Sequence, residues 1–176
     1  CSSDLGIRRV VTGHDDNGKA VVIFDGDAPN VKNPTSGIES TLFWVNNATP
    51  ADNSGSEDAG NADVPIAPGP GGAIFRVVEF GPEGDGAESE DELDYLSKAG
   101  GAEQPEGARH PGMHKTNSID YALIMEGEID MLMDDTEVHL QAGDVVVQRG
   151  TVHAWANRGS APCKIAFILI DAVPAP

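Results

Sequence analysis

Five polar residues in the C-terminal half of the chain have types and spacing that could do chemistry: His114, Thr116, Asp120, His153 and Asn157. Residues two apart on a strand project to the same face, so His114, Thr116 and Asp120 share a side if their strand is regular. His153 and Asn157 share a face of a later strand by the same rule. Two imidazoles and one carboxylate are a ligand set used by Fe(II), and they also suit Mn, Ni or Zn.

The elements that must position these residues are short strands. Apolar runs at 121–125, 129–133 and 145–147 are separated by turn residues such as Gly127 and Gly143. Short apolar runs bounded by Gly and Asp are typical of strands in a compact all-β unit. The sequence therefore predicts an all-β sandwich or jelly roll.

The same stretch resembles the paired motifs of the cupin superfamily, in the form found in small single-domain, conserved-barrel cupins. The matching positions are His114, Thr116, Asp120 and Gly127 for the first motif, and Gly143, Gln148, Gly150, His153 and Asn157 for the second. Two positions depart from the pattern, because Thr116 replaces a second His and Asp120 replaces the usual Glu. The resemblance implies a double-stranded β-helix, or jelly-roll barrel, in which the two motifs meet inside.

Such a barrel would hold one divalent transition metal (Fe, Mn, Ni or Zn) on His114, Asp120 and His153. Thr116 would then hold a metal-bound water or orient a ligand, since a hydroxyl is a poor ligand at neutral pH. The alternative is a metal-free, hydrogen-bonded polar pocket in which Asp120 or His153 is a general base. Trp155 is expected to form an apolar wall of this pocket.

Arg76 is a further candidate catalytic residue. It lies in the apolar run 73–80, where Arg76 and Glu79 fall on opposite faces by two-residue alternation. One of the two charges must point inward, where a charge is costly unless it is paired or faces a wet pocket. A partner at the rim or in a dimer interface is the alternative for Arg76.

The whole chain, residues 1–176, is predicted to be one domain. N-terminal strands are expected within 7–45, with a loop over 29–37 between them. A polar, Gly- and Pro-rich insertion loop follows at 46–72, and then the core barrel at 73–171. The only helix signal covers 88–99, where a capping box precedes Gly100-Gly101.

Charge and composition exclude several classes of partner. The formal net charge is −18 and the pI is about 4.3, so nucleic acid and anionic membranes are not expected to bind. No apolar run is long enough for a membrane span. Cys1 and Cys163 cannot form a disulfide framework. A cytoplasmic location is expected, with a lipoprotein beginning at Cys1 as the alternative.

The function that these features favour is a metal-assisted small-molecule enzyme that acts on an organic acid or on a carbonyl or polyketide-like metabolite. Decarboxylation, dehydration, isomerisation and oxygenation all fit such a site, so lyase, isomerase and oxidoreductase classes remain open. A non-catalytic small-molecule-binding protein is the alternative. A homodimer paired through the apolar strands of residues 7–24 is expected.

Overall fold

The computed structural model describes residues 6–84, 95–98 and 100–175. Its strands are β1 (Arg8–His14), β2 (Ala20–Asp27), β3 (Asn30–Thr35), β4 (Ile38–Asn46), β5 (Ala73–Phe80), β6 (Ala102–Glu103), β7 (Lys115–Thr116), β8 (Ser118–Glu126), β9 (Glu128–Leu132), β10 (Glu137–Gln141), β11 (Val145–Arg149), β12 (Ala154–Ala156) and β13 (Cys163–Asp171). A 3₁₀ helix, η1, covers Ala59–Asn61. Residues 95–98 are helical, and the rest of the predicted helix at 88–99 lies outside the described residues.

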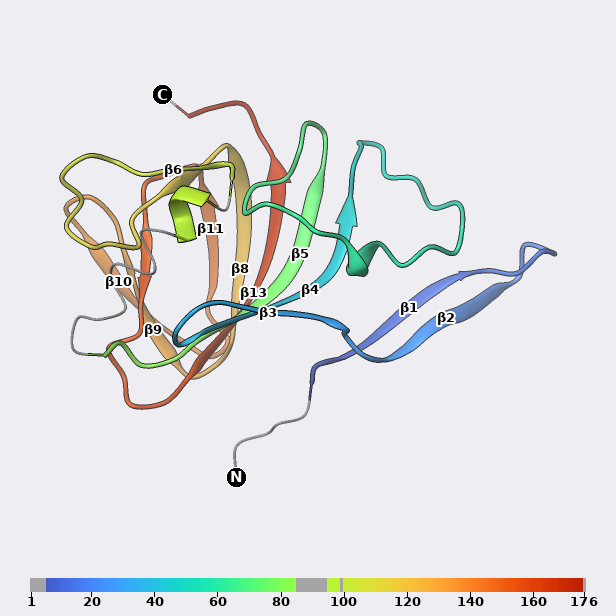
Figure 1. Cartoon of the computed structure of the whole chain (residues 1–176), viewed down its shortest axis with the longest axis horizontal. Helices are drawn as coiled ribbons and strands as arrows, with labels where there is room; N and C mark the ends of the chain where they lie inside the picture. The colour runs from blue at the N-terminus through green and yellow to red at the C-terminus, as the bar shows by residue number, and fades with distance from the viewer. Residues whose placement is uncertain (1–5, 85–94, 99, 176) are drawn as a thin grey trace.

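Two antiparallel sheets form the barrel, which confirms the predicted all-β cupin fold (Figure 1). One sheet has six strands in the order β11-β8-β13-β5-β4-β3, and the other has three in the order β10-β9-β12. Their facing sides share one apolar core, to which Ile74 and Ile165 contribute from the larger sheet and Ile129 and Met131 from the smaller. Among the described residues, no helix is long and apolar enough to cross a membrane.

Two glycines make the tight connections of the barrel. Gly127, between β8 and β9, has a φ of 77°, and a Cβ there would lie 2.5 Å from the carbonyl oxygen of Pro162. Gly143, before β11, has a φ of 97° with open space around it. Positive φ values are strained for residues that carry a Cβ, so these turns select glycine.

The outer face of the six-stranded sheet is apolar and exposed. Val147 pairs with Tyr121, Tyr121 with Ile168, and Ile168 with Phe75, so one row of large side chains crosses four strands. All four side chains are exposed. β13 is thus buried on one face only.

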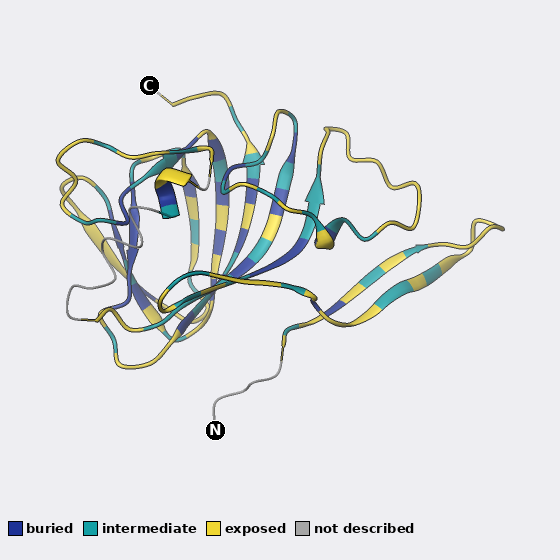
Figure 2. Cartoon of the chain, in the orientation of Figure 1, coloured by how far each residue is buried: buried dark blue, intermediate teal, exposed yellow. Residues whose placement is uncertain are grey.

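The β1–β2 hairpin projects away from the barrel as an arm, and most of its surface is exposed (Figures 1 and 2). One buried side chain, Arg9, fastens the base of the arm: it donates to the carboxylate of Asp58 at 2.7 and 2.6 Å and to the carbonyl oxygen of Phe43 at 3.0 Å. Asp58 in turn caps η1 by accepting from the Gly60 N–H at 2.9 Å. The middle of the 46–72 loop is therefore tied to the arm.

The prediction of a loop over 29–37 is wrong, because residues Asn30–Thr35 form the edge strand β3. Its pairing with β4 is irregular between Lys32 and Thr35, where Pro34 lies. Proline is tolerated on an edge strand because no neighbour needs its missing N–H.

Candidate active site

His114 and His153 meet directly, although 38 residues separate them in the chain. They form an antiparallel bridge in which each backbone N–H donates to the other residue's carbonyl oxygen at 2.9 Å. The centres of the two imidazole rings are 4.7 Å apart. The fold thus brings together the two motif histidines, as the family resemblance implied.

Hydrogen bonds fix how the two imidazoles present their nitrogens. His114 Nδ1 lies 2.8 Å from the carbonyl oxygen of Gly112, and His153 Nδ1 lies 3.0 Å from that of Thr151. A carbonyl oxygen only accepts, so each Nδ1 carries the proton and each Nε2 keeps its lone pair. Burial lowers the pKa of His114, and it lowers that of His153 to about 3 with a further contribution from the charge of His114. Both rings are therefore neutral near pH 7.

Asp120 lies at the end of a short hydrogen-bonded chain along one face of β7 and β8. Thr116 Oγ1 is 2.8 Å from Ser118 Oγ, and Ser118 Oγ donates to Asp120 Oδ1 at 2.6 Å. All three side chains are buried. The alternation of a strand places residues 116, 118 and 120 on the same side, which the sequence predicted for Thr116 and Asp120.

Burial raises the pKa of Asp120 to about 6, against the opposing effects of the Ser118 hydrogen bond and the charge of Arg76. A carboxyl group with this pKa exchanges its proton readily close to neutral pH. That is the property that a general acid or base requires. Desolvation is the dominant cause, as is common at catalytic carboxylates.

Arg76, on β5, supplies the positive charge of the site. Its Nη2 donates to the carbonyl oxygens of Pro65 at 2.8 Å and Ile66 at 3.1 Å. Its Nε is shielded from solvent and has no hydrogen-bond partner. Burial lowers the pKa of the guanidinium, and Tyr95 and Asp120 oppose this effect. A buried N–H without a partner is costly, so this atom is suited to a ligand's oxygen.

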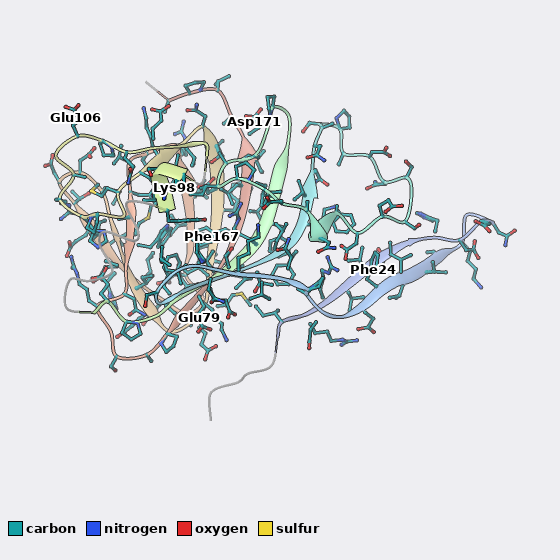
Figure 3. The ribbon with its side chains drawn as sticks, in the orientation of Figure 1. Phe24, Glu79, Lys98, Glu106, Phe167 and Asp171 are labelled. Carbon is teal, nitrogen blue, oxygen red and sulfur yellow. The ribbon has the colours of Figure 1, made fainter. Side chains whose placement is uncertain are left out.

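These side chains line a cavity of about 110 Å³. His114, Thr116, Asp120, His153 and Arg76 form its polar part. Apolar walls enclose the remainder: Ile38, Ile66, Val78, Phe80, Leu96, Trp155, Phe167 and Leu169. Figure 3 labels Phe167 within the barrel. Trp155 contacts both His153 and Phe167, with ring centres 5.9 and 5.4 Å away.

Asn157 does not line this cavity. Its amide donates to the carbonyl oxygens of Phe80 at 2.8 Å and Ala161 at 2.9 Å, and its side-chain oxygen accepts from the Gly159 N–H. It secures the turn before β13.

The sequence predicted that His114, Asp120 and His153 would bind a metal. The two Nε2 lone pairs suit a metal ion, but in the part of the chain that the structure describes no three His, Cys, Asp or Glu side chains are close enough to hold one. Protein metal sites usually need at least three protein ligands. His114, Asp120 and His153 therefore do not fit a three-ligand centre in this arrangement.

Sequence reasoning missed two residues of the site. Ser118 links Thr116 to Asp120, and its place two residues from each was the available signal. Tyr95 lines the cavity together with Leu96, on a segment for which the sequence predicted a helix but no part in the site. A short amphipathic helix carries no signal of which surface it covers.

Comparison with protein families gives one match: the Cupin_2 model, described as a cupin domain, matches residues 102–170. Similar proteins come from fungi. "Phomopsin biosynthesis cluster protein C'" of Diaporthe leptostromiformis is 30% identical, over 94% of this chain and 79% of that protein. "Cupin-domain-containing oxidoreductase fogC" of Aspergillus ruber is also 30% identical, over 94% of this chain and 74% of that protein.

Solved structures with a similar fold include the cupin domain of Schizosaccharomyces pombe Cnp3. It has a TM-score of 0.47 and 14% identity, over 93% of this chain and 87% of that one. A Cupin 2 conserved barrel domain protein from Salinispora arenicola has a TM-score of 0.44 and 13% identity, over 83% and 85% of the two chains.

Proposed function

This chain belongs to the cupin family, and from that premise we propose that it is a small-molecule enzyme that moves a proton within the barrel cavity. The substrate class is a carbonyl compound with an acidic C–H, and the reaction is an isomerisation or a dehydration next to that carbonyl. The observation that carries the proposal is a buried carboxyl with a pKa of about 6, Asp120, in one cavity with the unpartnered Nε–H of Arg76.

Each group has a defined role in this reaction. The Asp120 carboxylate takes a proton from the carbon beside the carbonyl, and the electron pair of that C–H bond moves onto the carbonyl oxygen. Arg76 Nε–H binds this oxygen as its negative charge develops. Protonated Asp120 then returns the proton to another carbon, or to a departing hydroxyl group in a dehydration.

The neighbouring groups keep these two in position. Ser118 donates to Oδ1 of Asp120, which leaves the other carboxylate oxygen for the substrate. The neutral histidines offer two Nε2 lone pairs, which accept hydrogen bonds from substrate hydroxyl groups. The apolar walls exclude water, so the charge on Arg76 acts more strongly than it would in solvent.

Deuterium exchange tests the proposal without knowledge of the natural substrate. We expect the protein to accelerate exchange of the C–H protons beside the carbonyl of acetophenone in D₂O, measured by NMR. Asp120→Asn should abolish the acceleration, while Asp130→Asn, at a half-buried carboxylate of β9 outside the cavity, should keep it. Exchange at the same rate with Asp120→Asn would refute the role of Asp120. Exchange that disappears after dialysis against EDTA would favour the metal-assisted alternative instead.

A redox reaction is the second candidate function, and the names of relatives support it. Those of Aspergillus ruber, Neurospora crassa and Hypocrea virens are called cupin-domain-containing oxidoreductases. Such a reaction needs an electron acceptor. Oxygen uptake that depends on an added carbonyl substrate and on His114 and His153 would favour this candidate over proton transfer.

We also propose that the chain forms a homodimer. Val10 and Val22 are exposed on the projecting arm, and an apolar row crosses the outer face of the six-stranded sheet. Burial of both surfaces against a second copy would remove them from water. Light scattering should give twice the chain mass, and Val22→Asp should lower it; a monomer at all concentrations would contradict the dimer.

A further inference from the structure

A series of hydrogen bonds leads to His114 from two residues that do not line the cavity, Glu83 and His110. The Nδ1 atom of His110 accepts from the Gly112 N–H at 3.1 Å. An amide N–H only donates, so this Nδ1 keeps its lone pair and the proton of the ring lies on Nε2. That Nε2–H donates to Glu83 Oε1 at 2.9 Å. His110 thus joins a partly exposed carboxylate to the backbone just before His114.

His110 holds both peptide groups that flank Gly112. Its ring holds the Gly112 N–H, and its carbonyl oxygen accepts from the Met113 N–H at 3.1 Å. The Met113 N–H shares a peptide group with the Gly112 carbonyl, whose oxygen accepts from His114 Nδ1 at 2.8 Å. A peptide group is planar, so holding its N–H also sets the direction of its carbonyl. His110 therefore aims the oxygen that fixes the His114 ring.

Glu83 is held in turn by Asn157. The Glu83 backbone N–H donates to the carbonyl oxygen of Asn157 at 2.8 Å, and the Asn157 side chain donates to that of Phe80 at 2.8 Å. The segment that follows β5 is therefore tied to the end of β12 at two points. The His110 side chain is 16% exposed, so water competes less for its bond to Glu83 than for an ion pair on the open surface.

We propose that His110 and Glu83 are positioning residues that keep the proton of His114 on Nδ1 and leave its Nε2 as an acceptor in the cavity. The hydrogen bonds of an imidazole decide which of its nitrogens carries the proton. With the proton on Nε2, His114 would present a donor instead and would no longer accept from a substrate N–H or O–H. Use of this acceptor by a substrate rests on the proposed function, whereas the position of the proton does not.

NMR spectroscopy of the His114 ring tests the proposal. Two-bond correlations between ring protons and ring nitrogens distinguish the Nδ1–H from the Nε2–H tautomer, and the spectrum of His114→Gln assigns the signals. We expect the natural protein to show the Nδ1–H tautomer at pH 7. A change of tautomer is a signature that a general loss of stability does not produce.

Two substitutions of His110 form a matched pair. His110→Leu leaves the Gly112 N–H without an acceptor, so the ratio of Nε2–H to Nδ1–H at His114 should rise roughly five- to tenfold, as expected for the loss of one hydrogen bond. His110→Asn should restore the natural ratio, because an asparagine oxygen accepts from the backbone N–H two residues later. An unchanged ratio in His110→Leu, or the same increase in both variants, would overturn the proposal.

Glu83→Ala tests the outer contact and leaves the turn around Gly112 intact. It should raise the same ratio roughly threefold, because His110 loses the restraint on its ring but keeps its bond to Gly112. His139→Leu removes an exposed histidine from β10 and serves as the control, with no change expected. A natural ratio in Glu83→Ala, or an equal increase in His139→Leu, would contradict the role of Glu83.

The two proposals fail in distinguishable ways. The tautomer is measured without substrate, so it does not depend on Asp120 acting as a base. Deuterium exchange that is unchanged in Asp120→Asn, together with a tautomer that follows the His110 substitutions, would refute the proton-transfer role alone. Exchange that depends on Asp120, together with one tautomer in all variants, would refute the positioning role alone.

Discussion

Replacing Asp120 by Asn should stabilise the protein at neutral pH, and the effect can be calculated from the burial of this side chain. Asp120 is 5% exposed, and its pKa rises from an ordinary 3.8 to about 6. Each pKa unit corresponds to about 1.4 kcal/mol, so the folded protein should lose about 3 kcal/mol when this carboxyl ionises. Asn has a similar shape and keeps an oxygen that accepts from Ser118, but it does not ionise.

The sign of the effect follows from where the proton is held more tightly. A raised pKa means that the folded state keeps the proton of Asp120 at pH values where the unfolded chain has released it. The free energy of unfolding of the natural protein therefore falls as pH rises from about 4 to about 6, relative to that of Asp120→Asn. Below pH 4 both states are protonated and the difference vanishes.

Urea unfolding of both proteins between pH 4 and pH 8 measures this difference. The histidines are present in both proteins, so their contributions cancel. Asp58→Asn is a control in which the effect should have the opposite sign. Hydrogen bonds from Arg9 lower the pKa of Asp58, so replacing this carboxylate should destabilise the protein above pH 4. A constant difference between the natural protein and Asp120→Asn across this range would refute the desolvation argument.

Three further predictions concern activity, a turn and the arm. If Asp120 is the base, deuterium exchange should rise with pH through an apparent pKa near 6, and a flat profile would contradict this. Gly143→Ala should lower the free energy of unfolding by about 1 kcal/mol, because its positive φ strains a residue with a Cβ. Gly127→Ala should lower it by more, because its Cβ would also clash with the carbonyl oxygen of Pro162. Equal losses for the two variants in thermal unfolding would argue against that clash. Arg9→Met should cost about 2 kcal/mol, whereas Arg8→Met, at an exposed ion pair, should cost less than about 1 kcal/mol in the same measurement.

The barrel could be predicted because its signals are local. Apolar runs of strand length alternate with glycine turns, and the positive φ values at Gly127 and Gly143 show why glycine stands there. β3 could not be predicted in this way, since Asn30–Thr35 is polar and contains a proline. Its strand structure depends on an edge of the sheet that only the folded protein provides.

The site was predictable in part for the same reason. Strand alternation placed Thr116 and Asp120 on one face, and the family motifs implied that His114 and His153 would meet. Whether Asp120 reaches those histidines closely enough for a metal depends on the barrel's tertiary geometry, which residue spacing does not specify. The position of the Arg76 side chain in the cavity likewise depends on tertiary contacts, because its Nη2 donates to the carbonyl oxygens of Pro65 and Ile66 in the 46–72 loop.

The Arg9–Asp58 ion pair has a consequence for how this protein can change during evolution. Asp58 caps η1, and Asn30 donates to the carbonyl oxygens of Gly60 and Ala62 in and after this helix. The backbone then continues to Pro65, whose carbonyl oxygen accepts from Arg76. A continuous series of contacts therefore connects the arm to Arg76, which lines the cavity. Substitutions at the base of the arm are therefore expected to change how the cavity binds its ligand.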